Sequence, residues 1–302
     1  NSTCSGPEQS YSDAPKSNTP ESVLKALKDA GFDVLTLANS HIFDYGWLGV
    51  ERTYRSVLDA GLKPSGIYMS DKDYYNPLIV NVEGVNVAVL SYTANTGGNE
   101  ALIPKDKLAY CIKYIRASTI TEDITAARAN GAHLVVVYMH WGEEYKETPN
   151  DNMRDMAQIA LDAGADAVIG TYPQVIQEAK TKAVNRKDGS IMETVIAYSL
   201  GNFITSQRIA PRDSGVILNL SYEFETATEN IRLSGISYVP TWVSMNETDG
   251  SDKNYRVLPV GYYINNAELL SSLPSNAQQR IQEVWQHTTS RLGTSPFVPQ
   301  YQ

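Results

Sequence analysis

The stretch LKALKDAGFDVLTLA, residues 24–38, joins a helical pattern to a buried strand through a single glycine. Gly31 supplies the left-handed residue that commonly follows the last turn of a helix. The run from Val34 to Ala38 is rich in Val and Leu, which is typical of a strand buried on both faces. This stretch therefore predicts one helix–strand step of an α/β fold.

The same step recurs three more times along the first two-thirds of the chain. A helical stretch ends in glycine and an apolar run follows at once, in residues 54–68, 123–139 and 156–170. The glycines are unequally spaced, which argues against a solenoid of equal repeats. Repeated helix–strand steps favour the α/β class with a largely parallel sheet.

Other segments predict antiparallel strands. Residues 77–92 alternate in polarity around Glu83-Gly84, which is typical of a β-hairpin. A polar loop is expected over residues 246–254, and no linker is rich enough in Pro, Gly or Ser to force a domain boundary. We therefore expect one domain over residues 1–302, whose later part contains four further strands at Thr194–Ser199, Gly215–Phe224, Ile231–Val243 and Tyr255–Val260.

Two helix starts carry capping patterns. Thr19 followed by Pro20 predicts an N-cap and the first helical residue. Ser275 with Gln278 three residues later forms a capping box, which predicts the start of a C-terminal helix. Residues 1–18 are polar and turn-rich, and we expect them to form a loop.

The composition excludes several classes of protein. Of 302 residues, 34 are acidic and 25 basic, which gives a formal net charge of −9, and 42% are hydrophobic. Such a chain is globular, and without a basic run it is a poor candidate for binding nucleic acid or anionic membranes. No stretch approaches the roughly 20 apolar residues of a membrane span. The two cysteines, Cys4 and Cys111, are too few for a zinc cluster, and the sequence does not decide whether they pair.

Polar residues follow four of the predicted buried strands. In an open α/β sheet, ligands bind outside the carboxyl ends of the strands, so we expect these side chains to line one cleft. Two of the four histidines, His41 and His140, are among them. The candidate site residues are Asn39, His41 and Asp44; His140, Glu143 and Glu144; Tyr172 and Gln174; and Asn202, Gln207 and Arg208.

Structural roles remain open for several of these residues. His41 and Asn202 are also suited to turns, where their side chains would bond the backbone. His140 is also suited to a buried position beside Trp141. Glu143 and Glu144 are equally typical of a solvated helix start.

Four motifs together carry a family resemblance: LKALKDAGFDVLTLANSHIFDYG (24–46), HWGEEYKETP (140–149), LDAGADAVIGTYPQVIQ (161–177) and AYSLGNFITSQR (197–208). In this order and spacing the sequence resembles the bacterial CapA-type family of capsule or poly-γ-glutamate biosynthesis proteins. The resemblance covers about residues 19–226, and residues 227–302 add the antiparallel strands and the C-terminal helix.

The resemblance implies a calcineurin-like metallophosphoesterase fold, a four-layer α-β-β-α sandwich. It also implies that the chain begins after the family's first strand and its metal-binding Asp, so that the N-terminal strand is missing. The protein would then act outside the cytoplasm at the bacterial cell surface, anchored to the membrane in its full-length form through a segment that is not present.

The chain departs from the family's metal-binding motifs. The family usually reads Ala-Asn-Asn-His, and Ser40 stands where related phosphoesterases place a metal-binding Asn. It usually reads Gly-His-His-Pro-His, and here Thr171, Tyr172 and Gln174 stand at the three His positions. Thr, Tyr and Gln are poor substitutes for imidazole toward a transition metal. We therefore expect no tightly held cofactor, the alternative being one weakly bound divalent metal.

Two functions remain open, and with them the question of whether the chain is an enzyme. The first is an accessory protein of capsule or poly-γ-glutamate production whose cleft binds the anionic polymer or another capsule-synthesis subunit. Its binding residues would include several amides together with Arg208, which are suited to carboxylate or phosphate groups. The second is a metal-dependent phosphoesterase-like hydrolase, with His140 as a metal ligand and His41 as the general acid.

Overall fold

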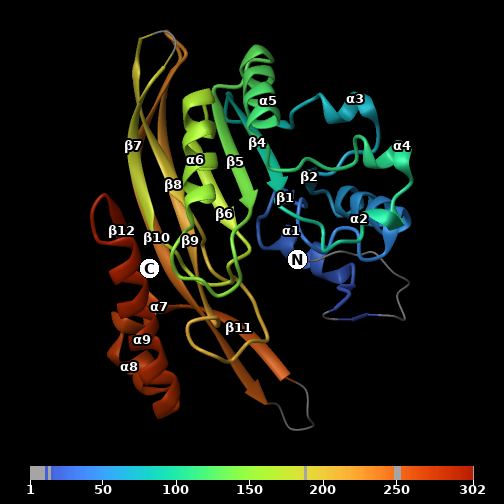
Figure 1. Ribbon diagram of the computed structural model, residues 1–302. Coiled ribbons are helices and arrows are strands. Elements are labelled where there is room, and N and C mark those ends of the chain that lie inside the picture. Colours follow the sequence, from blue (N-terminus) through green and yellow to red (C-terminus); the bar gives the residue numbers. More distant parts are fainter. Residues whose placement is uncertain (1–10, 13–14, 187–188, 248–252, 302) are drawn as a thin grey trace. The chain divides into compact units, whose positions relative to one another are not determined.

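The structure of the protein is a computed structural model that describes residues 11–12, 15–186, 189–247 and 253–301 (Figure 1). The chain forms two compact units. Unit 1 comprises residues 1–141 and 158–165, and unit 2 comprises residues 142–157 and 166–302. Helix α6 (Asp151–Ala163) contributes residues to both units. The single domain expected over residues 1–302 stays a prediction.

Unit 1 opens with the predicted helix–strand step around Gly31. Helix α1 (Ser22–Asp29) ends before this glycine, whose φ is 92°, and strand β1 (Val34–Thr36) follows it. Helix α2 (Gly46–Asp59) leads in the same way to strand β2 (Lys63–Ser65), which pairs with β1 in parallel. The apolar faces of both helices enclose a core that includes Leu24, Val50, Val57 and Leu62.

A second group of strands in unit 1 contains the predicted hairpin. Strands β3 (Ile79–Val82) and β4 (Val85–Thr93) are antiparallel and turn at Glu83-Gly84. Strand β4 pairs in parallel with β5 (Leu134–His140), and helix α5 (Ala117–Ala129) packs against both strands (Figure 1). The short helices of this unit are α3 (Asp71–Tyr74), η1 (Glu100–Leu102) and α4 (Lys105–Leu108).

An ion pair is buried between α5 and β4. Lys113 Nζ lies 2.5 Å from Asp123 Oδ1, and the Tyr92 hydroxyl donates to Asp123 Oδ2 at 2.8 Å. The ammonium also lies 5.1 Å and 4.5 Å from the ring centroids of Tyr68 and Tyr74. Because Lys113 is 2% exposed, its charge is balanced by one carboxylate and two aromatic faces rather than by water.

Unit 2 contains the fourth predicted step and a strand that the sequence did not predict. Strand β6 (Ala167–Thr171) pairs in parallel with β8 (Ile191–Ala197), and β7 (Ala179–Asn185) pairs with β8 antiparallel. The sequence AKTKAVN of β7 is mostly exposed, and it lacks the apolar alternation from which a strand is predicted.

A four-stranded sheet completes the strands of unit 2. Strand β10 (Asn230–Glu247) pairs antiparallel with β9 (Ser214–Glu225) and β11 (Lys253–Pro259), and in parallel with β12 (Phe297–Pro299). Strand β10 also contacts β8, so the two sheets of unit 2 pack together. Strands β8, β9, β10 and β11 confirm the four strands predicted after residue 190, whereas β12 was not predicted. The loop expected at 246–254 lies partly outside the described residues.

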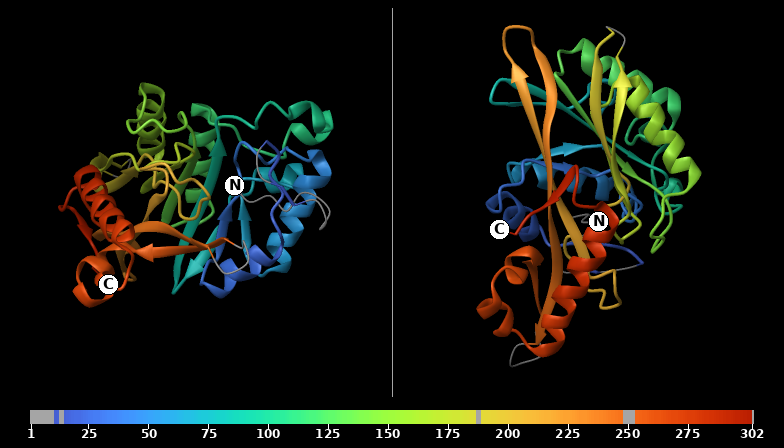
Figure 2. Two further views of the ribbon diagram at one scale, coloured as in Figure 1. Left: turned by 90° about the horizontal axis from the view of Figure 1, so that it is seen from below. Right: turned by 90° about the vertical axis from the view of Figure 1, so that its left-hand side faces the viewer.

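Three helices follow β11, and two of them, the first and the third, pack against strand β10 of the four-stranded sheet. The three helices are α7 (Val260–Ile264), α8 (Ala267–Ser271) and α9 (Ser275–Leu292). Figure 2 shows α9, in red, lying along β10 in the right-hand view. The Asp213 carboxylate accepts from the Arg280 guanidinium at 2.6 and 3.1 Å and from the Trp242 indole at 2.8 Å, which ties α9 to the sheet.

The two predicted helix caps are wrong. Helix α1 begins three residues after Thr19, and Glu21 before it has helical backbone angles and caps no amide. A side-chain cap needs an extended backbone at that position. Helix α9 includes Ser275 as its first residue, so this hydroxyl does not cap the helix, and the Gln278 amide donates instead to the Leu273 carbonyl.

The predicted α/β class is confirmed by both units. Parallel pairs occur in β1–β2, β4–β5 and β6–β8. Strands β1, β2, β5 and β6 each follow a helix that is succeeded by a glycine with positive φ. The antiparallel portion after residue 190 is confirmed as well. The four-layer arrangement and the missing N-terminal strand stay predictions.

Candidate functional site

His41 and Asp44 form a hydrogen-bonded pair just beyond strand β1. His41 Nδ1 lies 2.7 Å from Asp44 Oδ2. The Asn39 carboxamide shapes the turn, because it accepts from His41 N at 2.9 Å and donates to the Leu37 carbonyl at 2.9 Å. A carboxylate on one ring nitrogen fixes the orientation and the tautomer of the imidazole.

Asp44 is a buried carboxylate whose oxygens already have partners. Oδ2 accepts from the backbone amide of Ser17 at 2.8 Å, and Oδ1 accepts from the Asn99 amide at 3.2 Å. The residue is 2% exposed, whereas the side chain of His41 is 27% exposed. Asp44 is therefore placed to orient His41 rather than to meet a ligand itself.

His140 lies against the same turn, at the end of strand β5. Its Nε2 accepts from the backbone amide of Ser40 at 3.2 Å and lies 3.4 Å from the Ser40 hydroxyl. Burial, with His41 nearby, lowers the pKa of His140 to about 3, so the ring is neutral at physiological pH. Unit 1 thus brings both predicted histidines to one turn, and the contacts of His140 are those of a buried structural residue.

A loop after strand β4 supports this turn, and the sequence analysis did not single it out. A Cβ atom at Gly97, whose φ is 70°, would lie 2.7 Å from the Ser40 carbonyl oxygen, so only glycine fits there. The Thr96 hydroxyl donates to Glu100 and lies 3.1 Å from the Tyr114 hydroxyl. The Gly97-Gly98 pair was the available signal, because paired glycines mark a tight loop.

In unit 2, side chains from three segments form what we call the amide cluster: Glu144, Tyr145, Gln174 and Gln207. Gln207 Nε2 donates to Gln174 Oε1 at 2.5 Å and lies 3.4 Å from the Tyr145 hydroxyl. Gln174 Nε2 donates in turn to Glu144 Oε1 at 2.8 Å. Three of the four were predicted site residues, and the structure brings them together.

Asn202 links the backbones of two segments at this cluster. Its amide donates to the Gln174 carbonyl at 3.2 Å and to the Arg212 carbonyl at 2.9 Å. The turn role that the sequence left open for Asn202 is therefore present. Glu143, in contrast, is exposed, and Tyr172 is half-buried, with a pKa raised by burial and by the Glu144 carboxylate.

The two arginines of this region have different surroundings. Arg208 donates to the backbone carbonyls of Thr205, Ser206 and Val243, at 2.6, 3.3 and 2.6 Å, so it fastens its loop. Arg212, which the sequence analysis missed, lies with Cζ 3.5 Å from the ring centroid of Tyr145. No sequence pattern distinguishes a stacked arginine from one bound to its own loop.

The backbone is strained at the amide cluster. Tyr145, Tyr172 and Gln174 have φ values of 64°, 96° and 59°. Among the described residues, only two other non-glycine positions, Glu83 and Glu229, have positive φ. Side chains of this size rarely adopt this conformation, and such strain gathers at functional sites. The cluster is therefore the stronger candidate for a ligand site in unit 2.

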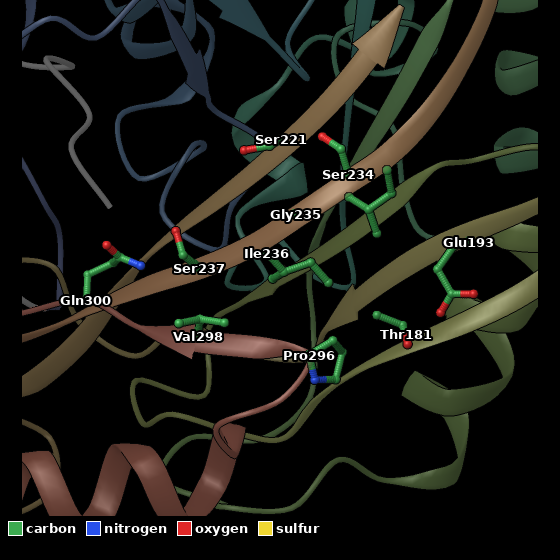
Figure 3. A pocket seen from close by; sticks show the side chains of 11 residues that line it. Thr181, Glu193, Ser221, Ser234, Gly235, Ile236, Ser237, Pro296, Val298 and Gln300 are labelled. Carbon is green, nitrogen blue, oxygen red and sulfur yellow. The ribbon is translucent and has the colours of Figure 1, made fainter.

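A separate open groove of about 560 Å³ lies in unit 2. Figure 3 shows Thr181 and Glu193, from β7 and β8, facing Ser234, Gly235 and other residues of β10. None of the predicted site residues lines this groove.

Comparison with known proteins decides the family. Residues 1–207 match the family described as bacterial capsule synthesis protein PGA_cap. The chain belongs to this family. The CapA-type resemblance of the sequence is thereby confirmed.

Two curated relatives of PGA_cap type come from Bacillus. The capsule biosynthesis protein CapA of Bacillus anthracis is 37% identical over 191 residues, which cover 62% of this chain and 43% of that protein. The PGA biosynthesis protein CapA of Bacillus subtilis (strain 168) is 32% identical over 222 residues, which cover 70% of this chain and 53% of that protein. The chain thus spans about half the length of the curated relatives it matches.

Two solved structures are similar at low identity. The sulfate thiohydrolase SoxB from Thermus thermophilus is 15% identical and the calcineurin-like phosphoesterase YfkN from Bacillus subtilis is 14% identical, each with a TM-score of 0.42. Each match covers 89% of this chain, and 39% and 74% of those chains, respectively. At this TM-score the likeness carries no argument about fold or activity.

The donor set of this PGA_cap chain does not fit a two-metal centre. Such a centre needs several nitrogen and oxygen ligands around each ion. Within the described ranges, no three His, Cys, Asp or Glu residues are grouped to hold a metal ion. The Nε2 lone pair of His140 is taken by the Ser40 amide, and Asp44 has three partners. The prediction that His41, His140, Tyr172 and Asn202 line one cleft stays a prediction.

Proposed function

We propose that this chain is an accessory protein of capsule production at the bacterial cell surface, where it binds an anionic polymer of the poly-γ-glutamate class. Membership of the PGA_cap family supports this role, as do the names of the two Bacillus relatives. Another capsule-synthesis subunit is the alternative partner.

The amide cluster is the observation on which the proposal rests. Where the family usually has imidazoles that bind metal, this chain has a tyrosine and an amide, held by a strained backbone beside a stacked arginine. Amides and a guanidinium are suited to carboxylates. Because the chain carries a net charge of −9, a polyanion is repelled at long range, so binding depends on such a local site.

We further propose that the full-length protein acts outside the cytoplasm and is anchored to the bacterial membrane through a segment beyond this chain. Capsule production at the cell surface supports this location. In the part of the chain that the structure describes, no helix has the length and apolar character of a membrane span.

Polymer binding tests the proposal directly. Fluorescently labelled poly-γ-glutamate of defined length is expected to bind the chain in a fluorescence-anisotropy titration at about 0.15 M salt, where the long-range repulsion from the net negative charge is screened. Neutral dextran and a single-stranded oligonucleotide serve as controls. Absence of polyglutamate binding, or equal binding of the oligonucleotide, would count against the proposal.

A second candidate, a phosphoesterase-like hydrolase, is favoured only by the His41–Asp44 pair. A partly exposed imidazole oriented by a carboxylate is the arrangement of a general acid. The hydrolase would also need metal ions, and the donors described above do not fit them.

Metal content therefore separates the two candidates. After mild chelation, the purified protein is expected to retain well under one equivalent of Zn, Mn or Fe, because affinity depends on the number of placed donors. Elemental analysis measures this. Two equivalents of metal, together with aryl phosphate ester hydrolysis that His140→Ala abolishes, would restore the hydrolase. The single weakly bound ion that the sequence left as the alternative would be lost on chelation.

A further inference from the structure

Arg212 of unit 2 has an unusual environment for a half-buried arginine. Its guanidinium Cζ lies 3.5 Å from the ring centroid of Tyr145, so the two groups are stacked. The backbone is fixed on both sides, because Arg212 N donates to the Ile209 carbonyl at 2.8 Å and Arg212 O accepts from Asn202 at 2.9 Å. Stacking on an aromatic ring holds the guanidinium in one orientation.

The hydrogen-bond donors of this guanidinium are not used within the described part of the chain. No carboxylate or carbonyl of the described residues accepts from the Arg212 N–H groups. The guanidinium instead stacks on the ring of Tyr145. Arg208, four residues earlier, donates to three backbone carbonyls instead. Of these two arginines, Arg212 is therefore the one that can offer a fork of N–H groups to a ligand.

We propose that Arg212 is the residue of unit 2 that binds a carboxylate of the anionic polymer, an inference that rests on the proposed function. The guanidinium is planar and matches both oxygens of a carboxylate, and its stack on Tyr145 means that little freedom is lost on binding. The sequence-based choice of Arg208 as the anion-binding arginine is then replaced by a residue four positions later.

The neighbouring groups select the kind of anion. Gln207 is held by Gln174 and lies 3.4 Å from the Tyr145 hydroxyl, so it helps to position the ring. Glu144 ends the same chain of hydrogen bonds with a carboxylate. The negative charge of Glu144 repels any anion, and it repels a densely charged one such as polyphosphate more strongly than a polymer whose carboxylates are farther apart.

Substitution of Arg212 tests the inference in the same anisotropy titration with labelled poly-γ-glutamate. Arg212→Ala is expected to weaken binding about tenfold or more, since a charge-assisted bidentate contact is lost. Arg212→Lys keeps the charge but not the fork, so an intermediate loss of several-fold is expected. Arg256→Ala is the matched control, because Arg256 is an exposed arginine of unit 2 on β11, and it should change binding less than about twofold.

The outcomes distinguish this inference from the proposed function. If the unsubstituted chain does not bind polyglutamate, the proposed function fails. If it binds, and Arg212→Ala and Arg256→Ala weaken binding equally, only the role of Arg212 is overturned. Polyphosphate is titrated in the same way. If Arg212→Ala removes polyphosphate binding but leaves polyglutamate binding intact, the role of Arg212 is overturned as well. Thermal unfolding of each variant shows whether the fold is retained, and Arg212→Lys remains informative if Arg212→Ala does not fold.

Discussion

Replacing Lys113 with alanine is expected to lower the free energy of unfolding by about 3–5 kcal/mol. The substitution removes the ammonium that lies 2.5 Å from Asp123 and leaves that carboxylate buried without its cation. The Tyr92 hydroxyl remains as a neutral donor to this carboxylate. Urea denaturation followed by far-UV circular dichroism measures the loss.

An exposed ion pair in the same unit provides the control. Lys25 and Asp29 lie 2.9 Å apart with side chains 77% and 65% exposed, so Lys25→Ala should cost less than about 1 kcal/mol. The double variant Lys113→Met with Asp123→Asn should recover much of the loss, because both charges are then gone while an acceptor for Tyr92 remains. Equal losses for Lys113→Ala and Lys25→Ala would show that the buried pair is not a stabilising element of unit 1.

The second large effect is a loss of stability in acid through His140. Its pKa is about 3 in the folded protein, because the ring is buried, compared with roughly 6.5 in an unfolded chain. As the pH falls, the unfolded state therefore takes up the proton of this imidazole at a higher pH than the folded state does. The stability that comes from the neutral ring is fully present above about pH 6.5 and is lost as the pH falls toward 3, at about 1.4 kcal/mol per pH unit.

His140→Gln isolates this contribution. Glutamine offers an acceptor to the Ser40 amide but does not titrate, so the variant should lose less stability between pH 7 and pH 5 than the unsubstituted chain. Comparison of the two chains is needed because burial also lowers the pKa of His287, whose contribution is common to both. Identical pH dependence of the urea midpoints would refute the assignment to His140.

Local patterns were sufficient to predict the α/β class and most of the strands. The four glycine-terminated helices and the apolar runs after them are elements that short-range sequence decides, and each is present. The helix caps at Thr19 and Ser275 were wrong, because a capping pattern fixes a helix start only to within a few residues. Strand β7 was missed since its stability comes from pairing with β8 rather than from its own composition.

The candidate site could be predicted only in part. The strand ends pointed to His41 and to His140, whose ring accepts from Ser40 in the turn that contains His41 in unit 1. They also pointed to Gln174 and Gln207, which form a hydrogen bond in unit 2. It did not reveal which arginine is stacked and which is bound to its loop, because that depends on contacts between residues 67 positions apart, Tyr145 and Arg212. The aromatic faces around Lys113 were missed for the same reason.

The buried thiol of Cys111 can report how often the core of unit 1 opens to solvent. Its side chain is fully enclosed, and burial raises the pKa of the thiol to about 12, so the reactive thiolate scarcely forms in the closed protein. Cys4 is the one other cysteine of the chain, and Cys4→Ser would leave a single thiol. The rate at which a thiol reagent then modifies Cys111 measures how often the core of unit 1 becomes accessible to solvent, under conditions in which the protein remains native.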